Sequence, residues 1–258
     1  MEFLVFGEKH LPVVMLIHGA GWSRTFVRHA EQLKDRYCVV VPVLDGYGND
    51  ATQRYGSTVQ SANELLAYID EVWGGKLFAL AGVSLGGQIA LEMLTQRRKL
   101  AKYAIVEGAL CIPQPHLLKY TLIHRGLFRF MTGGVMAKLS NRRLPRHFQL
   151  DRASMDACIQ EMSAFHKDSI DALFVSHNAY VLREELRVCE VPLLCLVAGK
   201  DPAPIRRSAT LLQEVMHDCR VEILPEYRHG ELSVHRPQEW ISRALRFWDK
   251  ANSRAVQR

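Results

Sequence analysis

The stretch LFALAGVSLGGQIALEML, residues 77–94, decides the fold. An apolar run of strand length leads into Gly82-Val83-Ser84-Leu85-Gly86, and apolar residues then resume at helical spacing. A strand that turns at once into a helix leaves little room beside its central residue, so glycines are needed on both sides. The pattern predicts a sharp turn that holds the Ser84 hydroxyl above the carboxyl end of a buried strand.

Apolar runs of strand length alternate with helix-like segments on both sides of this turn. The predicted strands cover 13–17, 37–43, 77–83, 103–107, 191–198 and 220–224, and one further candidate strand covers 2–7. The predicted helices cover about 25–33, 58–72, 88–97, 203–215 and 238–249. Near-continuous apolar strands separated by helices are typical of a mostly parallel sheet with helices on both faces. The sequence therefore predicts an α/β fold.

The alternation stops between residues 113 and 188, where no strand is predicted. Two helical stretches are expected there, one over about 118–131 and one from about 152 to 186. The simplest organisation is an α/β core made of residues 1–112 and 189–258, interrupted by a helical cap at residues 113–188.

Length and composition indicate a single chain with a sizeable core, since 48% of its 258 residues are apolar. No apolar run reaches the 18–20 or so residues that span a bilayer, and the first residues do not resemble a secretory signal. The six cysteines show no Cys-x-x-Cys spacing and are expected to be reduced core residues. A cytoplasmic location is the expectation that follows.

The net charge of +6 is unevenly distributed. The segment 113–150 has seven basic residues and no acidic one: Lys119, Arg125, Arg129, Lys138, Arg142, Arg143 and Arg146. We interpret this segment as a solvated positive surface. A weak association of the segment with anionic lipid surfaces stays open as an alternative. Nucleic acid is not expected as a partner, because no recognisable binding motif accompanies the charge. The oligomeric state is not predicted.

A nucleophilic role for the serine requires a base and an acid that orients the base, because a hydroxyl is a weak nucleophile at neutral pH. Such side chains gather beyond the carboxyl ends of the strands in an open α/β sheet. The strand at 191–198 ends just before Asp201, and the strand at 220–224 leads into a loop that carries His229. The chain order Ser84, Asp201, His229 therefore predicts nucleophile, orienting acid and base.

A fourth element follows the strand at 13–17, which ends in His18-Gly19-Ala20-Gly21. Small residues let the backbone approach closely there. We expect the amide N–H of Ala20 to join that of Leu85, at the start of the helix after the serine, in an oxyanion hole. His18 is expected to hydrogen-bond backbone groups under this loop rather than to act as a base.

Two residues compete with these assignments. His235, just ahead of the last predicted helix, is the rival base, although a surface or capping role suits it better. Glu107, at the end of the strand at 103–107, could replace Asp201 as the orienting acid. Otherwise Glu107 lines the floor of the pocket or hydrogen-bonds a loop.

Together these motifs resemble those of the α/β-hydrolase superfamily, in its capped, esterase-like form. The turn Asp45-Gly46-Tyr47-Gly48 is similar to the family's turn after its second core strand. The resemblance implies an α/β-hydrolase fold with a mostly parallel sheet, helices on both faces and a helical cap inserted after the sixth strand. Two features depart from the family. At most one strand precedes residue 13, and Arg228 stands before His229 where relatives often have glycine.

The resemblance and the three residues predict a serine hydrolase that cleaves a small-molecule carboxylic ester through an acyl-enzyme. Trp22 is a candidate for the acyl pocket, and the cap adds apolar side chains that include Phe128 and Phe130. A lipid-like acyl ester is the subsidiary expectation. No cofactor or metal is expected, because no dinucleotide, phosphate-loop or metal-binding motif is present in a suitable context.

Several functions use the same machinery and stay open as alternatives. They are thioesterase, lactonase, C–C bond hydrolase and aminopeptidase activity. An aminopeptidase needs carboxylates in the cap to bind a free amine. The acid-free segment 113–150 disfavours it, although Asp156, Glu161 and Asp168 follow later in the cap. A non-catalytic ligand-binding receptor of this fold is the alternative from another class, disfavoured because binding alone does not need all three residues.

Overall fold

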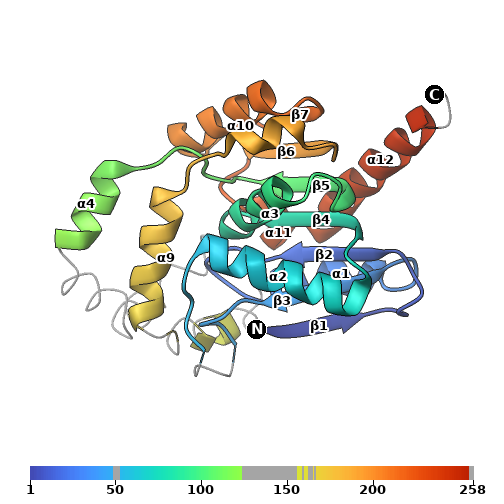
Figure 1. Cartoon of the computed structure of the whole chain (residues 1–258), viewed down its shortest axis with the longest axis horizontal. Helices are drawn as coiled ribbons and strands as arrows, with labels where there is room; N and C mark the ends of the chain where they lie inside the picture. The colour runs from blue at the N-terminus through green and yellow to red at the C-terminus, as the bar shows by residue number, and fades with distance from the viewer. Residues whose placement is uncertain (49–52, 124–155, 159, 162–164, 166, 256–258) are drawn as a thin grey trace.

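The computed structural model describes the chain except residues 49–52, 124–155, 159, 162–164, 166 and 256–258. Its centre is a seven-stranded sheet with the strand order β1-β3-β2-β4-β5-β6-β7 (Figure 1). All neighbouring strands are parallel except β1, which pairs antiparallel with β3. The α/β-hydrolase fold predicted from the sequence is therefore confirmed.

The strand boundaries follow the apolar runs of the sequence. They are β1 (Glu2–Phe6), β2 (Val13–Ile17), β3 (Cys38–Val43), β4 (Leu77–Val83), β5 (Ala101–Glu107), β6 (Leu193–Ala198) and β7 (Cys219–Leu224). Residues of the central strands alternate between the two faces, so Met15 and Ile17 lie in one apolar cluster while Val14 and Leu16 lie in the other. Burial on both faces explains why these strands read as continuous apolar runs.

Each face of the sheet is covered by its own helices (Figure 1). One face packs against α2 (Thr58–Trp73), α3 (Leu85–Gln96) and α10 (Ala203–Val215). The other packs against α1 (Val27–Leu33) and α12 (Pro237–Ala255), which supplies the fully buried Trp240 and Trp248. The six cysteines are free thiols, and five of them are buried.

Helices α4 (Pro115–Ile123) and α9 (Lys167–Ala179) come between β5 and β6 in the sequence, in the segment predicted as a cap. The expectation that this segment follows the sixth strand is corrected here. It follows the fifth strand of this chain, β5, because a single strand, β1, precedes β2. The prediction of helix as far as residue 186 was wrong in part. Helix α9 ends at Ala179, and only the short 3₁₀ helix η1 (Glu184–Val188) follows.

Hydrogen bonds tie α9 to the core near the amino end of α2. The hydroxyl of Ser176 accepts from the backbone N–H of Thr58 at 2.8 Å, and that of Ser169 accepts from the N–H of Tyr55 at 3.1 Å. These contacts satisfy backbone donors that the loop before α2 and its first turn leave without helical partners.

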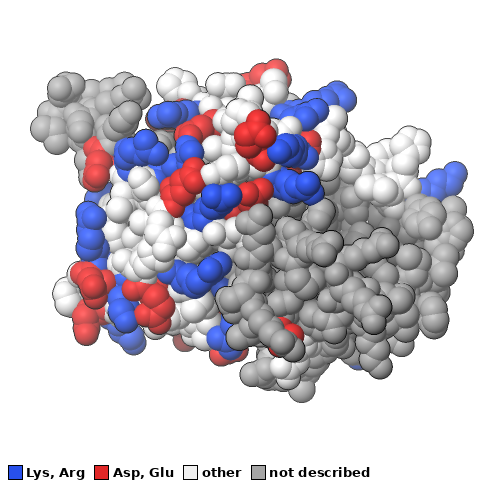
Figure 2. Space-filling model, turned by 180° about the vertical axis from the view of Figure 1, so that it is seen from behind, with Lys and Arg blue, Asp and Glu red and all other residues white. Residues whose placement is uncertain are grey.

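The described surface carries charges of both signs. Viewed from behind, Lys and Arg side chains alternate with Asp and Glu side chains over the part of the chain that the structure describes (Figure 2). Most of the basic segment 113–150 lies outside the described residues, so its surface role stays a prediction. Among the described helices, none has the length and apolarity needed to cross a bilayer.

The sheet sets the place of the functional residues. Ser84 follows β4, Asp201 follows β6, and His229 lies beyond β7. The strands β2, β4, β5, β6 and β7 run parallel, so their carboxyl ends meet at one edge.

Candidate active site

Ser84 occupies the turn between β4 and α3 in a strained backbone conformation. Its φ is 54° and its ψ is −113°, and it is the only non-glycine residue with a positive φ in the described chain. Its N–H donates to the carbonyl of Glu107 at 2.7 Å, and its own carbonyl accepts from Gln88 N–H at 3.1 Å. Strain of this kind persists only where surrounding contacts hold it, and it is concentrated at functional sites.

The glycines around Ser84 are required by close backbone contacts. A Cβ at Gly82 would lie 2.2 Å from the carbonyl oxygen of Gly86. A Cβ at Gly86 would lie 2.2 Å from the carbonyl oxygen of Ile17 and 2.5 Å from that of His18. Both clashes are with backbone, which cannot rotate away, so the sequence pattern of the turn has a steric cause.

Ser84, His229 and Asp201 form one chain of hydrogen bonds. His229 Nε2 lies 3.0 Å from Ser84 Oγ, and His229 Nδ1 lies 2.6 Å from Asp201 Oδ1. The carboxylate can only accept, so Nδ1 carries the proton and Nε2 presents its lone pair to the serine hydroxyl. The structure thus brings together the three residues that the sequence proposed as nucleophile, base and acid.

Asp201 is held by a second contact of its own. Its Oδ2 accepts the backbone N–H of Ala198 at 2.9 Å, while its side chain is 1% exposed. With one oxygen fixed by the backbone, the other oxygen points at the imidazole. The backbone at the end of β6 therefore fixes the orientation of the Asp201 carboxylate, which is shielded from solvent.

The pKa of His229 is raised above its ordinary value. Burial lowers it, but the hydrogen bond and charge of Asp201 and the charge of Glu107 outweigh burial. A base with a raised pKa takes up a proton more readily, which suits a group that must accept one from a hydroxyl and later release it.

The loop after β2 lies directly against the serine. A Cβ added to Gly19 would come within 3.4 Å of the Ser84 Cβ, so the loop that continues into Ala20 borders the nucleophile. Leu85 is the first residue of α3, and the N–H of such a residue has no acceptor within the helix. Both predicted oxyanion donors therefore belong to segments that border Ser84, and their role stays a prediction.

His18 contacts the backbone, as the sequence predicted. Its Nδ1 lies 2.7 Å from the carbonyl of Gly19, and its Nε2 accepts the N–H of Leu44 at 3.2 Å. Complete burial lowers its pKa, although the hydrogen bond to Gly19 and the charge of Glu161 oppose that shift. His18 is therefore neutral, with both nitrogens engaged, and joins the loop after β2 to the end of β3.

Two further residues that fix the loop after β2 were missed in the sequence. Tyr47 donates its hydroxyl to the carbonyl of Ala20 at 2.8 Å. Glu161 accepts from the N–H of Ser23 at 3.1 Å and from the N–H of Gly48 at 3.0 Å. The carboxylate of Glu161, from the predicted cap segment, thus joins two loops of the core. No local signal indicates this contact, because Glu161 lies 138 residues from Ser23 along the chain.

Glu107 makes no hydrogen bond to the imidazole in the described structure, where Asp201 contacts Nδ1 instead. Its buried carboxylate accepts from the backbone N–H groups of Leu232 and Ser233 at 3.2 and 2.9 Å, and from the Ser233 hydroxyl. Burial raises its pKa to about 7, although these hydrogen bonds and the charge of His229 lower it. Glu107 thus hydrogen-bonds a neighbouring segment, one of the two alternatives left open.

The rival base, His235, is the last residue of the short helix α11 (Glu231–His235), which the sequence analysis did not predict. Burial lowers its pKa to about 4. His229, and not His235, lies within hydrogen-bonding distance of the serine.

The predicted pocket residues are only partly described. Trp22 is 9% exposed, and its indole N–H has no partner in the described part of the chain. It lines a cavity of about 300 Å³ with Arg24, Gly48 and Glu161, and Ser84 is not among the described residues that line it. Phe128 and Phe130 lie outside the described residues. Among the described side chains, no group of three or more His, Cys, Asp or Glu could hold a metal ion.

Comparison with known proteins agrees with the fold. The model of the alpha/beta hydrolase family matches residues 14–244. No curated protein matches the chain significantly. Among solved structures, a thermophilic esterase from Thermogutta terrifontis is 18% identical, with a TM-score of 0.75 over 96% of this chain and 92% of the esterase.

Two other solved structures are similar over most of their length. An enol-lactonase from Burkholderia xenovorans is 15% identical, with a TM-score of 0.76 over 95% of each chain. A bacterial membrane phospholipase A is 22% identical, with a TM-score of 0.73 over 97% of this chain and 82% of the phospholipase. At these identities the likeness concerns the fold. The family match covers most of the sequence, and the chain belongs to the alpha/beta hydrolase family.

Proposed function

We propose that the protein is a serine hydrolase that cleaves carboxylic esters. The observation that supports this most directly is the hydrogen-bonded chain from Ser84 Oγ through His229 to Asp201 Oδ1. Nothing in simple ligand binding requires an imidazole aligned between a buried carboxylate and a hydroxyl on a strained turn.

In the proposed reaction, His229 Nε2 takes the proton of the Ser84 hydroxyl while the oxygen attacks the ester carbonyl. The N–H groups of Ala20 and Leu85 stabilise the oxyanion of the tetrahedral intermediate. The C–O bond to the alcohol breaks, and the alcohol leaves with the proton from His229. Water, deprotonated by the same nitrogen, then attacks the acyl-enzyme, and Ser84 regains its proton as the acid departs.

The charge of the imidazolium is balanced by Asp201 throughout. Its carboxylate accepts the Nδ1 proton and is itself oriented by the Ala198 N–H, so the imidazole need not reorganise between the two half-reactions.

Covalent labelling tests the proposal. A fluorophosphonate is expected to modify Ser84 stoichiometrically, because it forms a stable tetrahedral adduct with an activated serine hydroxyl. Peptide mapping by mass spectrometry identifies the site. The exposed Ser242, on α12, is the internal control and is expected to stay unmodified. Intact, folded protein without an adduct at Ser84 would contradict the proposal.

A lipid-like acyl ester is the substrate class that we propose within this function. It rests on the apolar and basic composition of the segment 113–150 and agrees with the fold shared with a phospholipase. We expect the kcat/KM for p-nitrophenyl esters to rise with acyl length from acetate to decanoate, and anionic vesicles to increase the rate further. A thioester and a lactone in the same panel separate the alternatives. A preference for acetate that vesicles leave unchanged would contradict the lipid assignment and leave the esterase proposal intact.

A further inference from the structure

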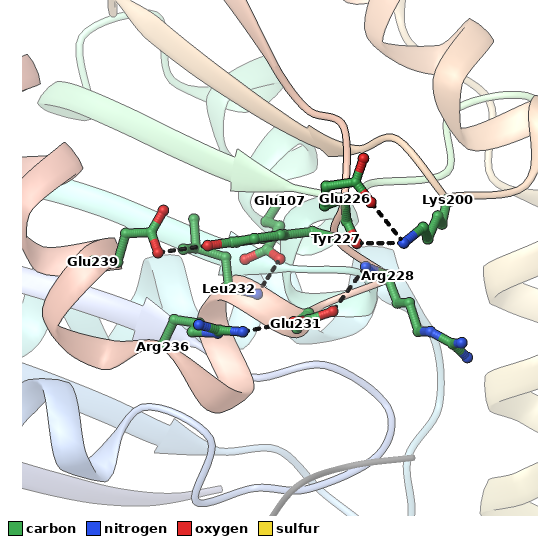
Figure 3. A network of polar contacts seen from close by, with 9 residues as sticks. All are labelled: Glu107, Lys200, Glu226, Tyr227, Arg228, Glu231, Leu232, Arg236 and Glu239. Carbon is green, nitrogen blue, oxygen red and sulfur yellow. Dashed lines mark hydrogen bonds and ion pairs between the residues drawn. The ribbon is translucent and has the colours of Figure 1, made fainter. Parts of the chain in front are cut away.

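The segment that follows His229 is hydrogen-bonded to one buried side chain, that of Glu107. Figure 3 shows Glu107, from the end of β5, directed at the backbone of Leu232 in α11. Among the polar contacts drawn around the loop, those of Glu226, Glu231 and Arg236 are exposed, whereas those of Glu107 are buried. The glutamate is 2% exposed.

Helix α11 has no cap of its own. Its N-cap is Gly230, which has no side chain to accept a hydrogen bond. Leu232 and Ser233 are the second and third residues of the helix, whose N–H groups have no acceptor within it. The carboxylate of Glu107 accepts both, so a residue 125 positions away supplies the missing cap.

The same glutamate also fixes the nucleophile. Its backbone carbonyl accepts the Ser84 N–H at 2.7 Å. The next residue, Gly108, lies so close beneath the imidazole that a Cβ there would come within 2.8 Å of His229 Cε1. One segment of two residues therefore contacts the backbone of Ser84, the ring of His229 and the helix that starts just after His229.

We propose that Glu107 is a positioning residue that ties the nucleophile to the base. Its carbonyl fixes Ser84, and its carboxylate fixes His229 through the first turn of α11. Only Gly230 and Glu231 separate His229 from Leu232 and Ser233, whose N–H groups the carboxylate accepts. The backbone position of His229 is therefore restricted by this contact. The inference rests on the proposed function, because it concerns the distance between Ser84 Oγ and His229 Nε2.

The charge of Glu107 adds a measurable signature. It raises the pKa of His229, together with Asp201 and against the effect of burial. Among the described residues, His177 of α9 also interacts with the imidazole. Burial and the charge of His229 hold His177 neutral by lowering its pKa to about 4. Removing the charge of Glu107 therefore lowers the pKa of His229, and the base becomes available at more acidic pH.

The test compares Glu107→Gln with wild type on a p-nitrophenyl ester across pH 5–9. A glutamine must present an NH₂ group to one of the two backbone N–H donors, so it loosens the loop as well as removing the charge. We expect kcat to fall about 10- to 100-fold, with KM changed less than about threefold, since misplacement of reacting groups costs rate. We also expect the acidic limb of the kcat/KM profile to move to lower pH.

Tyr227→Phe is the matched control. It removes a hydrogen bond from the same loop, that of the Tyr227 hydroxyl to Glu239, without touching Glu107. It is expected to keep the wild-type kcat and pH profile. Equal losses in both variants would overturn the inference, because any disturbance of the loop would then be sufficient.

Ser233→Ala keeps the test decisive if Glu107→Gln does not fold. It removes only the hydroxyl that bonds the carboxylate, which raises the pKa of Glu107 and so reduces its charge near neutral pH. We expect a smaller loss of kcat and a smaller shift of the acidic limb in the same direction. If Glu107→Gln and Ser233→Ala, or whichever of them folds, show wild-type kinetics, the inference is overturned. Labelling of Ser84 by a fluorophosphonate in those same proteins would show that the proposed function still stands.

Discussion

Ser84→Ala is expected to lower the kcat/KM for an ester by about 10⁴- to 10⁶-fold. Losses of this size follow when the nucleophile of a serine hydrolase is removed, because only oxyanion stabilisation and substrate binding remain. The alanine keeps the Cβ that the strained turn already accommodates, and the backbone hydrogen bonds to Glu107 and Gln88 do not involve the hydroxyl. The variant is therefore expected to fold normally, which circular dichroism and thermal melting can check.

The second variant of this experiment is His229→Ala, alone and combined with Ser84→Ala. The imidazole and the hydroxyl act as one unit, 3.0 Å apart, so the double variant is expected to lose little more than either single one. Ser242→Ala on α12 serves as the surface control and is expected to match wild type. If the two losses multiply, or if Ser84→Ala keeps more than about 1% of the activity, the two residues do not act together and the proposed mechanism is wrong.

The strands were predictable because each carries its own signal. β2 and β4 have the predicted bounds, and β3 and β7 differ by one residue at the start. Burial on both faces makes such strands continuous apolar runs, which need no tertiary information to recognise. The residues of the turn at Ser84 were predictable for a similar reason, since backbone clashes at Gly82 and Gly86 allow no side chain.

Contacts between distant segments were not predictable. Helix α11 has five residues, which are too few to show an apolar periodicity. Its cap is the side chain of Glu107, at the end of the distant strand β5. Glu161 joins two core loops from more than 110 residues away, and nothing in its neighbourhood distinguishes it from a surface glutamate. For Glu107 the sequence offered three roles: the orienting acid, a residue of the pocket floor, or a residue that hydrogen-bonds a loop. The positions of Asp201 and Ser233 favour the third role.

Asp201→Asn is the second change with a large expected effect, about 10⁴-fold in kcat with the fold retained. The Oδ2 atom of Asp201 accepts the Ala198 N–H, so the amide oxygen of an asparagine must take that place. The opposite orientation would set two buried donors against each other, which is costly. The NH₂ group then faces His229 Nδ1 and forces it to accept. The imidazole proton moves to Nε2, which can no longer take a proton from Ser84.

The same variant decides between the two acids that the sequence left open. Asp201 raises the pKa of His229, so its neutralisation lowers that pKa and moves the acidic limb of the remaining activity to lower pH. Asp218→Asn, ahead of β7, is the matched control and is expected to keep the wild-type rate. If Asp201→Asn keeps most of its activity while Glu107→Gln loses about 10⁴-fold, Glu107 is the orienting acid. An imidazole locked in the wrong tautomer cannot serve as the base, so retained activity in Asp201→Asn would show that Asp201 does not set the tautomer. The hydrogen bond between Asp201 and His229 would then have no role in proton transfer.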